Sequence, residues 1–239
     1  MSPTPIPSNF FIRVALIFLF IILSLGTAQL IILGILYTGY LPDDVSKWNS
    51  LHILISVFIQ AVVFLSFLAF INRRFSLPIY SFQGDAKLRD IALSFLGLIL
   101  VNLFSSQLMK LIGVEVNQFA EFNIDLLKDK SYAFLISTVV LAPLYEEVVF
   151  RGFILRTLVA NQEKNTRRVV LANFVTSLFF AAIHWDVQAA LPILILSLYL
   201  CALTLYKKSI RLSIITHSLQ NLFASIYFLY YAADVTQLV

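Results

Sequence analysis

Among the ionisable and amide side chains inside long apolar stretches of the sequence, six could do chemistry together. They are Glu146, Glu147, Arg151, His184, His217 and Asn221. A charged side chain at the centre of a bilayer costs roughly 2.5–3.5 kcal/mol on insertion scales. Carboxylates and imidazoles are also the side chains that most often move protons during catalysis. The set therefore indicates a functional site that faces the protein interior rather than lipid.

Helical spacing separates the two glutamates. Glu147 and Arg151 are four residues apart, so they share one helix face and can form an ion pair. Glu146 points about 100° away around the axis and stays free to face a cavity. Pro143, three residues earlier, loosens the backbone just before the pair. The alternative for this trio is a buried ion pair that only locks two helices together.

Each of the two histidines has a partner four residues away, Phe180 for His184 and Asn221 for His217, and each pair shares one helix face. A lone histidine in a helical bundle is more often a hydrogen-bonded core residue than a catalyst. Two histidines with Asn221 and an unpaired Glu146 would leave many buried polar groups in need of hydrogen-bond partners. If these side chains face one shared cavity, they can meet those needs together. Phe180 is the weakest member, because among 22 phenylalanines packing is its expected role.

The three motifs, in this order, resemble those of a known family of membrane proteases. They are Glu146-Glu147-x-x-x-Arg151, Phe180-x-x-x-His184 and His217-x-x-x-Asn221. They are similar to the motifs of the CAAX-protease and bacteriocin-processing group (CPBP, or Abi) of intramembrane glutamate endopeptidases. The resemblance covers roughly residues 131–232. It implies a helical bundle around a water-filled cavity, in which a peptide bond of a membrane-associated peptide or protein is hydrolysed.

The resemblance also implies a role for each residue. Glu146 would be the general base that activates water, helped by His184. His217 and Asn221 would polarise the scissile carbonyl and bind the oxyanion, which suits N–H donors aimed at one oxygen. The supporting residues would be Glu147, Arg151 and Phe180. No metal or other cofactor is expected.

Three other classes of protein compete with this interpretation. Two histidines and a glutamate could hold a catalytic zinc, although no H-E-x-x-H motif is present; activity that survives strong chelators and depends on Glu146 would exclude zinc. A non-catalytic scaffold or bacteriocin-immunity-type regulator would need no such set of residues. A transporter would favour broken helices or paired half-repeats, and neither is visible. The sequence leaves the substrate open, whether a prenylated tail, a leader peptide or another membrane peptide, and also the oligomeric state.

The elements that carry these residues are membrane helices. The chain is 60% hydrophobic and 13% charged, against about 45–50% and roughly 25% in a soluble domain. Seven apolar segments approach or exceed the length of about 20 residues that a bilayer requires. They span residues 12–37, 51–71, 90–113, 132–158, 169–186, 189–206 and 211–232. Continuous apolar runs are typical of helices rather than barrel strands.

We therefore predict an all-α polytopic transmembrane bundle of about seven spans, with an eighth helix between 114 and 131 left open. Residues 1–130 form N-terminal membrane helices, and residues 131–239 form the catalytic helices of the same domain. The expected partners are the lipid bilayer and a membrane-associated substrate. The net charge of +4 is modest, and no nucleic-acid partner is expected.

Basic residues divide unevenly between the breaks, which predicts orientation. With the N-terminus inside, twelve fall on the inner side: Arg13, Arg73, Arg74, Lys87, Arg89, Arg156, Lys164, Arg167, Arg168, Lys207, Lys208 and Arg211. Four fall outside: Lys47, Lys110, Lys128 and Lys130. We expect a multi-pass protein of the cell membrane with a cytoplasmic N-terminus and an external C-terminus.

Depth along the helices gives a further expectation. At about 1.5 Å per residue, Glu146 and Asn221 both lie roughly 15 Å from the inner charges. On the same count His184 lies roughly 24 Å from Arg168. A tilted or protruding fifth helix is needed to bring His184 to the level of the other two.

The orientation can be tested with two reporter fusions. A reporter placed after Lys208 is expected on the cytoplasmic side, and one placed after Val239 on the external side. Protease protection or a compartment-sensitive enzyme reads out each fusion. Finding both reporters on the same side would contradict the predicted topology.

Overall fold

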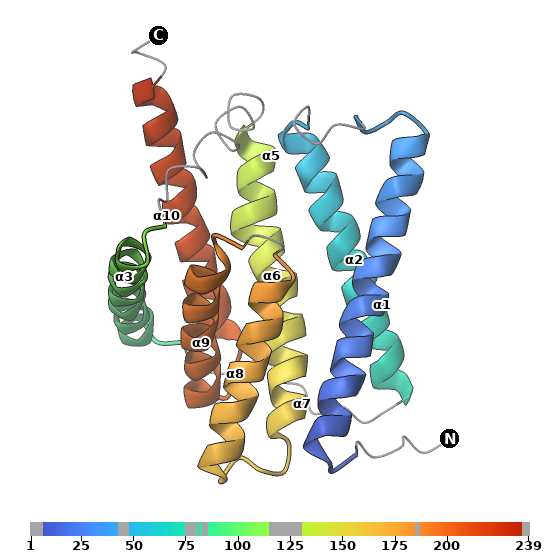
Figure 1. The fold of residues 1–239 in the computed structure, drawn as a ribbon, viewed down its shortest axis with the longest axis vertical. Helices are drawn as coiled ribbons and strands as arrows, with labels where there is room; N and C mark the ends of the chain where they lie inside the picture. The colour runs from blue at the N-terminus through green and yellow to red at the C-terminus, as the bar shows by residue number, and fades with distance from the viewer. Residues whose placement is uncertain are drawn as a thin grey trace.

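The computed structural model describes residues 7–42, 48–74, 80, 82, 86–114, 131–184 and 187–235. Every regular element within these ranges is helical (Figure 1). The first three helices are α1 (Phe10–Tyr37), α2 (Ser50–Arg74) and α3 (Leu88–Leu111). The last three are α8 (Thr166–Ala182), α9 (Ala190–Lys207) and α10 (Arg211–Val235). The all-helical fold class predicted from the sequence is confirmed.

The fourth predicted span is one helix whose backbone register changes along its length. It begins as α5 (Ser131–Leu135), widens in η2 (Ile136–Leu141), returns to α-helix in α6 (Ala142–Glu147), widens again in η3 (Val148–Leu155), and ends as α7 (Arg156–Val159). In the widened stretches the N–H groups bond five residues back instead of four. Such bulges occur frequently at functional sites.

All seven predicted segments are therefore helical, with boundaries that shift by a few residues. Within the described ranges, five helices are long and apolar enough to cross a membrane: α1, α2, α3, the fourth helix and α9. The 17-residue α8 and the more polar α10 are not among the five. The eighth helix that the sequence left open falls largely on 115–130, outside the described residues.

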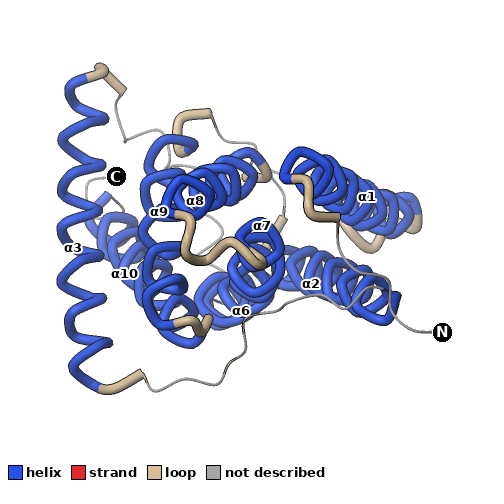
Figure 2. The backbone as a smooth tube through the Cα atoms, turned by 90° about the horizontal axis from the view of Figure 1, so that it is seen from below, coloured by secondary structure: helices blue, strands red, loops and turns tan. Residues whose placement is uncertain are grey.

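The fourth helix lies at the centre of the molecule. Seen along the bundle, it stands between α1 and α2 on one side and α8, α9 and α10 on the other (Figure 2). Its later residues Ile154, Leu155 and Leu158 are fully buried. The core around it is rich in phenylalanine, with Phe20 of α1 packing edge-on against Phe153 at a centroid distance of 5.2 Å. Large apolar side chains remain exposed along α1, α2 and α3, as expected of surfaces that face lipid.

Two arginines hold the end of this central helix. Arg13 of α1 is 3% exposed, and its Nη1 donates to the carbonyls of Thr157 at 2.7 Å and Ala160 at 3.1 Å. Arg168 of α8 donates to the carbonyl of Leu158 at 2.9 Å. The last carbonyls of a helix lack backbone donors and carry partial negative charge, so arginines satisfy them well. Two of the basic residues that predicted the inner side of the membrane thus also fix the end of the fourth helix to its neighbours.

The start of α1, the end of α2, the end of α7, the start of α8 and the end of α9 were assigned to the inner side, and they lie in the lower part of the molecule in Figure 1. The start of α3 was also assigned to that side, but it belongs to a helix that lies crosswise. The described end of α10 points the opposite way. This arrangement agrees with the alternation predicted from the basic residues, although which end faces the cytoplasm stays a prediction.

Helix α3 departs from the predicted bundle because it lies crosswise to the other helices (Figures 1 and 2). Its start is tied to the end of α9 by an ion pair between Asp90 and Lys207, with 2.7 Å between the charged atoms. Tyr199 of α9 donates its hydroxyl to the carbonyl of Ser94 at 2.8 Å. Gly97 makes this crossing possible, because a Cβ there would collide with the Tyr199 hydroxyl.

This crossing predicts opposite effects for two helical glycines. Gly97→Ala is expected to lower the free energy of unfolding by about 1–3 kcal/mol, as overpacking does. Gly26→Ala is the control, because a Cβ at Gly26 meets nothing within 4 Å. That control is expected to be neutral or slightly stabilising, since alanine favours helix. Thermal unfolding in detergent measures both, and equal stability of the two variants would contradict the packing described.

Candidate active site

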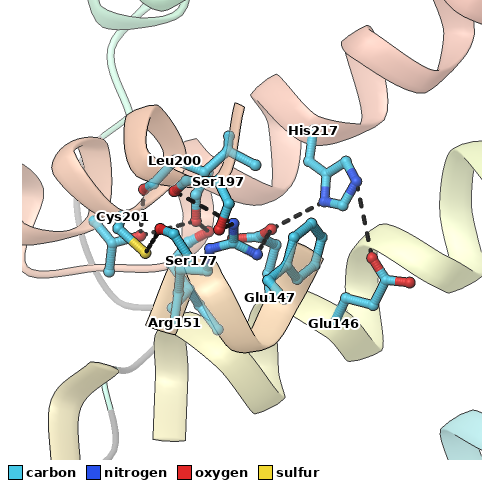
Figure 3. A network of polar contacts seen from close by, with 12 residues as sticks. Glu146, Glu147, Arg151, Ser177, Ser197, Leu200, Cys201 and His217 are labelled. Atoms are coloured by element: carbon cyan, nitrogen blue, oxygen red, sulfur yellow. Dashed lines mark hydrogen bonds and ion pairs between the residues drawn. The ribbon is translucent and has the colours of Figure 1, made fainter. Parts of the chain in front are cut away.

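The two glutamates end the short α-helical stretch α6 at the centre of the bundle. Glu147 is fully buried, and the whole Glu146 residue is 8% exposed. Their side chains leave the helix in different directions, one toward α9 and the other toward the opposite side of His217 (Figure 3). As helix geometry predicts, the two carboxylates point in different directions, and only Glu147 is paired with Arg151.

Glu147 and Arg151 form the ion pair predicted from their spacing. Arg151 Nη1 lies 2.8 Å from Glu147 Oε1, and both side chains are fully buried. Arg151 also donates through Nη2 to the hydroxyl of Ser197 on α9 at 2.8 Å. Its guanidinium lies over the ring of Phe180 on α8, 4.3 Å from the centroid. The buried cation is therefore met by a carboxylate, a hydroxyl and an aromatic face from three different helices.

His217 of α10 joins the two glutamates. Its Nδ1 lies 2.9 Å from Glu147 Oε1, and its Nε2 lies 3.9 Å from Glu146 Oε2 (Figure 3). Glu147 is paired with Arg151 and is an acceptor only, so the imidazole Nδ1–H must be the donor of the short bond. Nε2 is then the nitrogen that faces Glu146 and can exchange a proton there. A carboxylate that orients a catalytic imidazole in this way recurs in hydrolases.

Glu146 keeps hydrogen-bonding capacity for another group. Its distance of 3.9 Å from His217 Nε2 is longer than a direct hydrogen bond. Its neighbour Tyr145 is buried, with its hydroxyl 3.4 Å from Gln60 Oε1 of α2. The Glu146 carboxylate therefore lies beside the side chains of His217 and Tyr145, and no arginine or lysine among the described residues pairs with it.

Phe180 is a packing residue at the centre of the site, as its abundance in the sequence predicted. It is 1% exposed, and besides Arg151 its ring contacts both histidines. The centroid distances are 4.8 Å to His184 and 5.8 Å to His217. One aromatic ring therefore separates the two imidazoles, which brings His184 to the edge of the site.

His184 differs from its sequence prediction in one respect. The span predicted over 169–186 ends as a helix at Ala182, so His184 lies just beyond the helix and is exposed. The chain tightens there, with the His184 N–H bonded to the Ala181 carbonyl at 3.2 Å. Its Nδ1 lies 2.7 Å from the Phe180 carbonyl, which leaves Nε2 available. In Figure 1 α8 extends further toward the lower end than α9, as the depth argument required of a protruding fifth helix.

Asn221 lies one helical turn after His217 and contacts the fourth helix. Its Nδ2 donates to the carbonyl of Thr138 in η2 at 2.7 Å. The amide is half-buried, and its second N–H is not used in this bond.

The sequence alone did not identify Thr138 or Ser197 as residues of the site. Serines and threonines are common in apolar helices, and nothing in their spacing relative to the motifs distinguishes these two.

Metal binding was the main chemical alternative for these residues. Within the part of the chain that the structure describes, no group of three or more histidine, cysteine, aspartate or glutamate side chains is arranged to hold a metal ion. A zinc site built from Glu146, His184 and His217 would require these side chains to rearrange. Chelator resistance remains the direct test of that alternative.

Comparison with known proteins identifies the segment that carries this site. Residues 128–223 match the family model described as type II CAAX prenyl endopeptidase, Rce1-like. The match contains all three motifs and ends two residues after Asn221. The resemblance to the CAAX-protease group is therefore confirmed over this segment. Searches of curated proteins and of solved structures found no significant match.

The site predicts unequal effects on stability for its two glutamates. Glu147→Gln leaves the fully buried Arg151 without its carboxylate and weakens the bond to His217, so we expect a loss of about 3–5 kcal/mol. Glu146→Gln is the matched control, because Glu146 has no arginine partner, and we expect a change below about 1 kcal/mol. Thermal unfolding of both variants in detergent gives the comparison. A loss of similar size for both variants would contradict the assignment of the ion pair.

Proposed function

We propose that this membrane protein is an intramembrane endopeptidase of the glutamate type, which hydrolyses a peptide bond in a membrane-associated peptide or protein. The observation that carries the proposal is the buried chain of contacts from Arg151 through Glu147 and His217 to Glu146. This chain leaves one carboxylate without an arginine partner, beside an oriented imidazole. A scaffold has no need of that arrangement.

In the proposed reaction Glu146 is the general base. Its carboxylate takes a proton from water, and the hydroxide oxygen forms a bond to the carbonyl carbon of the scissile peptide. His184, whose Nε2 is not used in the bond to its own helix, helps to hold the water. Glu146 then returns the proton to the leaving nitrogen as the C–N bond breaks. The products are a carboxylic acid and an amine, so one water is consumed per bond.

His217 and Asn221 would stabilise the negative charge on the carbonyl oxygen of the tetrahedral intermediate. Because Glu147 takes the Nδ1–H of His217, only Nε2 is directed at the reacting atoms. It donates a hydrogen bond to the oxyanion when the ring carries both protons. The carboxylate of Glu147 compensates that positive charge, because Glu146 holds the proton taken from water at this stage. Asn221 adds its second amide N–H, and donors held in place before the reaction are effective in a site that excludes water.

The substrate class follows from where the site lies and from the family match. The catalytic helices are apolar and central to a membrane bundle, so a peptide bond reaches Glu146 only from a substrate held at the membrane. A peptide with a lipid anchor, or a membrane-inserted one, meets this requirement. The printed description of the matched family names CAAX prenyl endopeptidases, which makes a C-terminally prenylated peptide the first substrate to assay.

The decisive experiment measures cleavage of such a peptide by purified protein in lipid vesicles. Glu146→Gln is expected to abolish turnover while the protein stays folded. Asn221→Ala is expected to lower the rate of the chemical step about 10²- to 10³-fold, which is typical for the loss of one oxyanion donor. The double variant should be no worse than Glu146→Gln alone, since residues of one catalytic step are not additive.

Single-turnover kinetics separate the chemical step from substrate binding. Cleavage that continues undiminished in Glu146→Gln would overturn the glutamate mechanism. If Asn221→Ala weakened binding but kept the rate of the chemical step, the oxyanion role of Asn221 would be wrong.

A further inference from the structure

The bond between Asn221 and Thr138 has its origin in the backbone of the fourth helix. In an α-helix the carbonyl of Thr138 would accept the N–H of Ala142, four residues later. In this structure η2 is widened, and Ala142 donates instead to Ser137, five residues back. In the widened register the donor for Thr138 would be residue 143, which is proline and has no N–H. Both helical donors of Thr138 are therefore lost.

Asn221 takes the place of the missing backbone donor. Its amide nitrogen lies 2.7 Å from the Thr138 carbonyl oxygen. Because a carbonyl only accepts, the end of the amide that faces it must be the NH₂ group and not the oxygen. The bond therefore fixes which way round the amide lies. The remaining N–H of the amide is then held on one side of the side chain, and Asn221 shares its helix face with His217 one turn earlier.

We propose that Pro143 is a positioning residue for the oxyanion donor, and that it acts by keeping the carbonyl of Thr138 free to orient Asn221. The inference rests on the proposed function, because it explains how one of that site's donors is held. If Thr138 were bonded within its own helix, the Asn221 amide would lose its anchor and could turn its oxygen toward the substrate. An oxygen there repels the oxyanion that the N–H group is meant to stabilise.

The proposal gives Pro143 a role distinct from bending the helix. A proline inside a helix removes a hydrogen bond and weakens the helix, so its replacement by alanine should leave the protein as stable or more stable. In Pro143→Ala the Thr138 carbonyl gains a backbone donor in either register, residue 142 in the α form or residue 143 in the widened form. The variant should therefore be stable yet impaired in the chemical step.

The test compares Pro143→Ala with Pro192→Ala. Pro192 lies in the first turn of α9, where a helix has no N–H bond to lose. For Pro143→Ala we expect an unchanged or higher unfolding temperature, a kcat about 10- to 100-fold lower, as partial loss of an oxyanion donor gives, and a KM within about twofold. Pro192→Ala should keep all three at wild-type values. Wild-type kcat in Pro143→Ala would overturn the proposal.

A second readout needs no substrate. In protein labelled with ¹⁵N-asparagine, the side-chain amide signal of Asn221 is assigned by its disappearance in Asn221→Ala. We expect this signal to shift in Pro143→Ala and to stay in place in Pro192→Ala. An unshifted signal overturns the link between the proline and the amide, whatever the enzyme does. A shifted signal in a protein with no Glu146-dependent cleavage would instead overturn the proposed function.

Discussion

The fully buried charge of Arg151 is the constraint on which the rest of the site depends. A cation without water needs compensating partners, because the penalty for removing it from water amounts to several kcal/mol even after relaxation. Glu147, Ser197 and the ring of Phe180 supply that compensation from α6, α9 and α8. Once Glu147 is fixed by Arg151, its Oε1 also fixes His217 on α10. Four helices thus meet around one charge, and the imidazole of His217 is oriented as a consequence.

The same arrangement explains why two adjacent glutamates have different surroundings. The carboxylate of Glu147 has a structural role, because Arg151 and His217 both bond to it. Glu146, one residue earlier, has no cation within bonding distance in the described part of the chain apart from the ring of His217. A base must be able to accept a proton, and a carboxylate locked to arginine cannot do so readily. The proposed role of Glu146 as the base therefore depends on the pairing of Glu147 with Arg151.

The N-terminal helices contribute to the site although they lie outside the matched segment. Arg13 of α1 bonds to the end of the fourth helix, and Gln60 of α2 lies 3.4 Å from the hydroxyl of Tyr145, next to Glu146. The widened backbone and Pro143 weaken the fourth helix, a proline in a helix interior costing about 3 kcal/mol. Contacts on both sides of that helix offset this weakness. Buried residues of α1 and α2 accordingly belong to the same hydrophobic core as those of the fourth helix, α8 and α9.

The sequence by itself determined the helical fold, the seven helical segments and the Glu147–Arg151 pair. These depend on local properties: the length of apolar runs, and the 3.6-residue period that puts residues four apart on one face. It also grouped Glu146, His184, His217 and Asn221 through their motifs. Only the tertiary structure decided that His217 bridges the two glutamates, that α3 lies crosswise, and that Asn221 bonds to Thr138. Those facts depend on contacts between helices and on a change of backbone register. Neither leaves a periodic signal in the sequence, because the partners lie tens of residues apart.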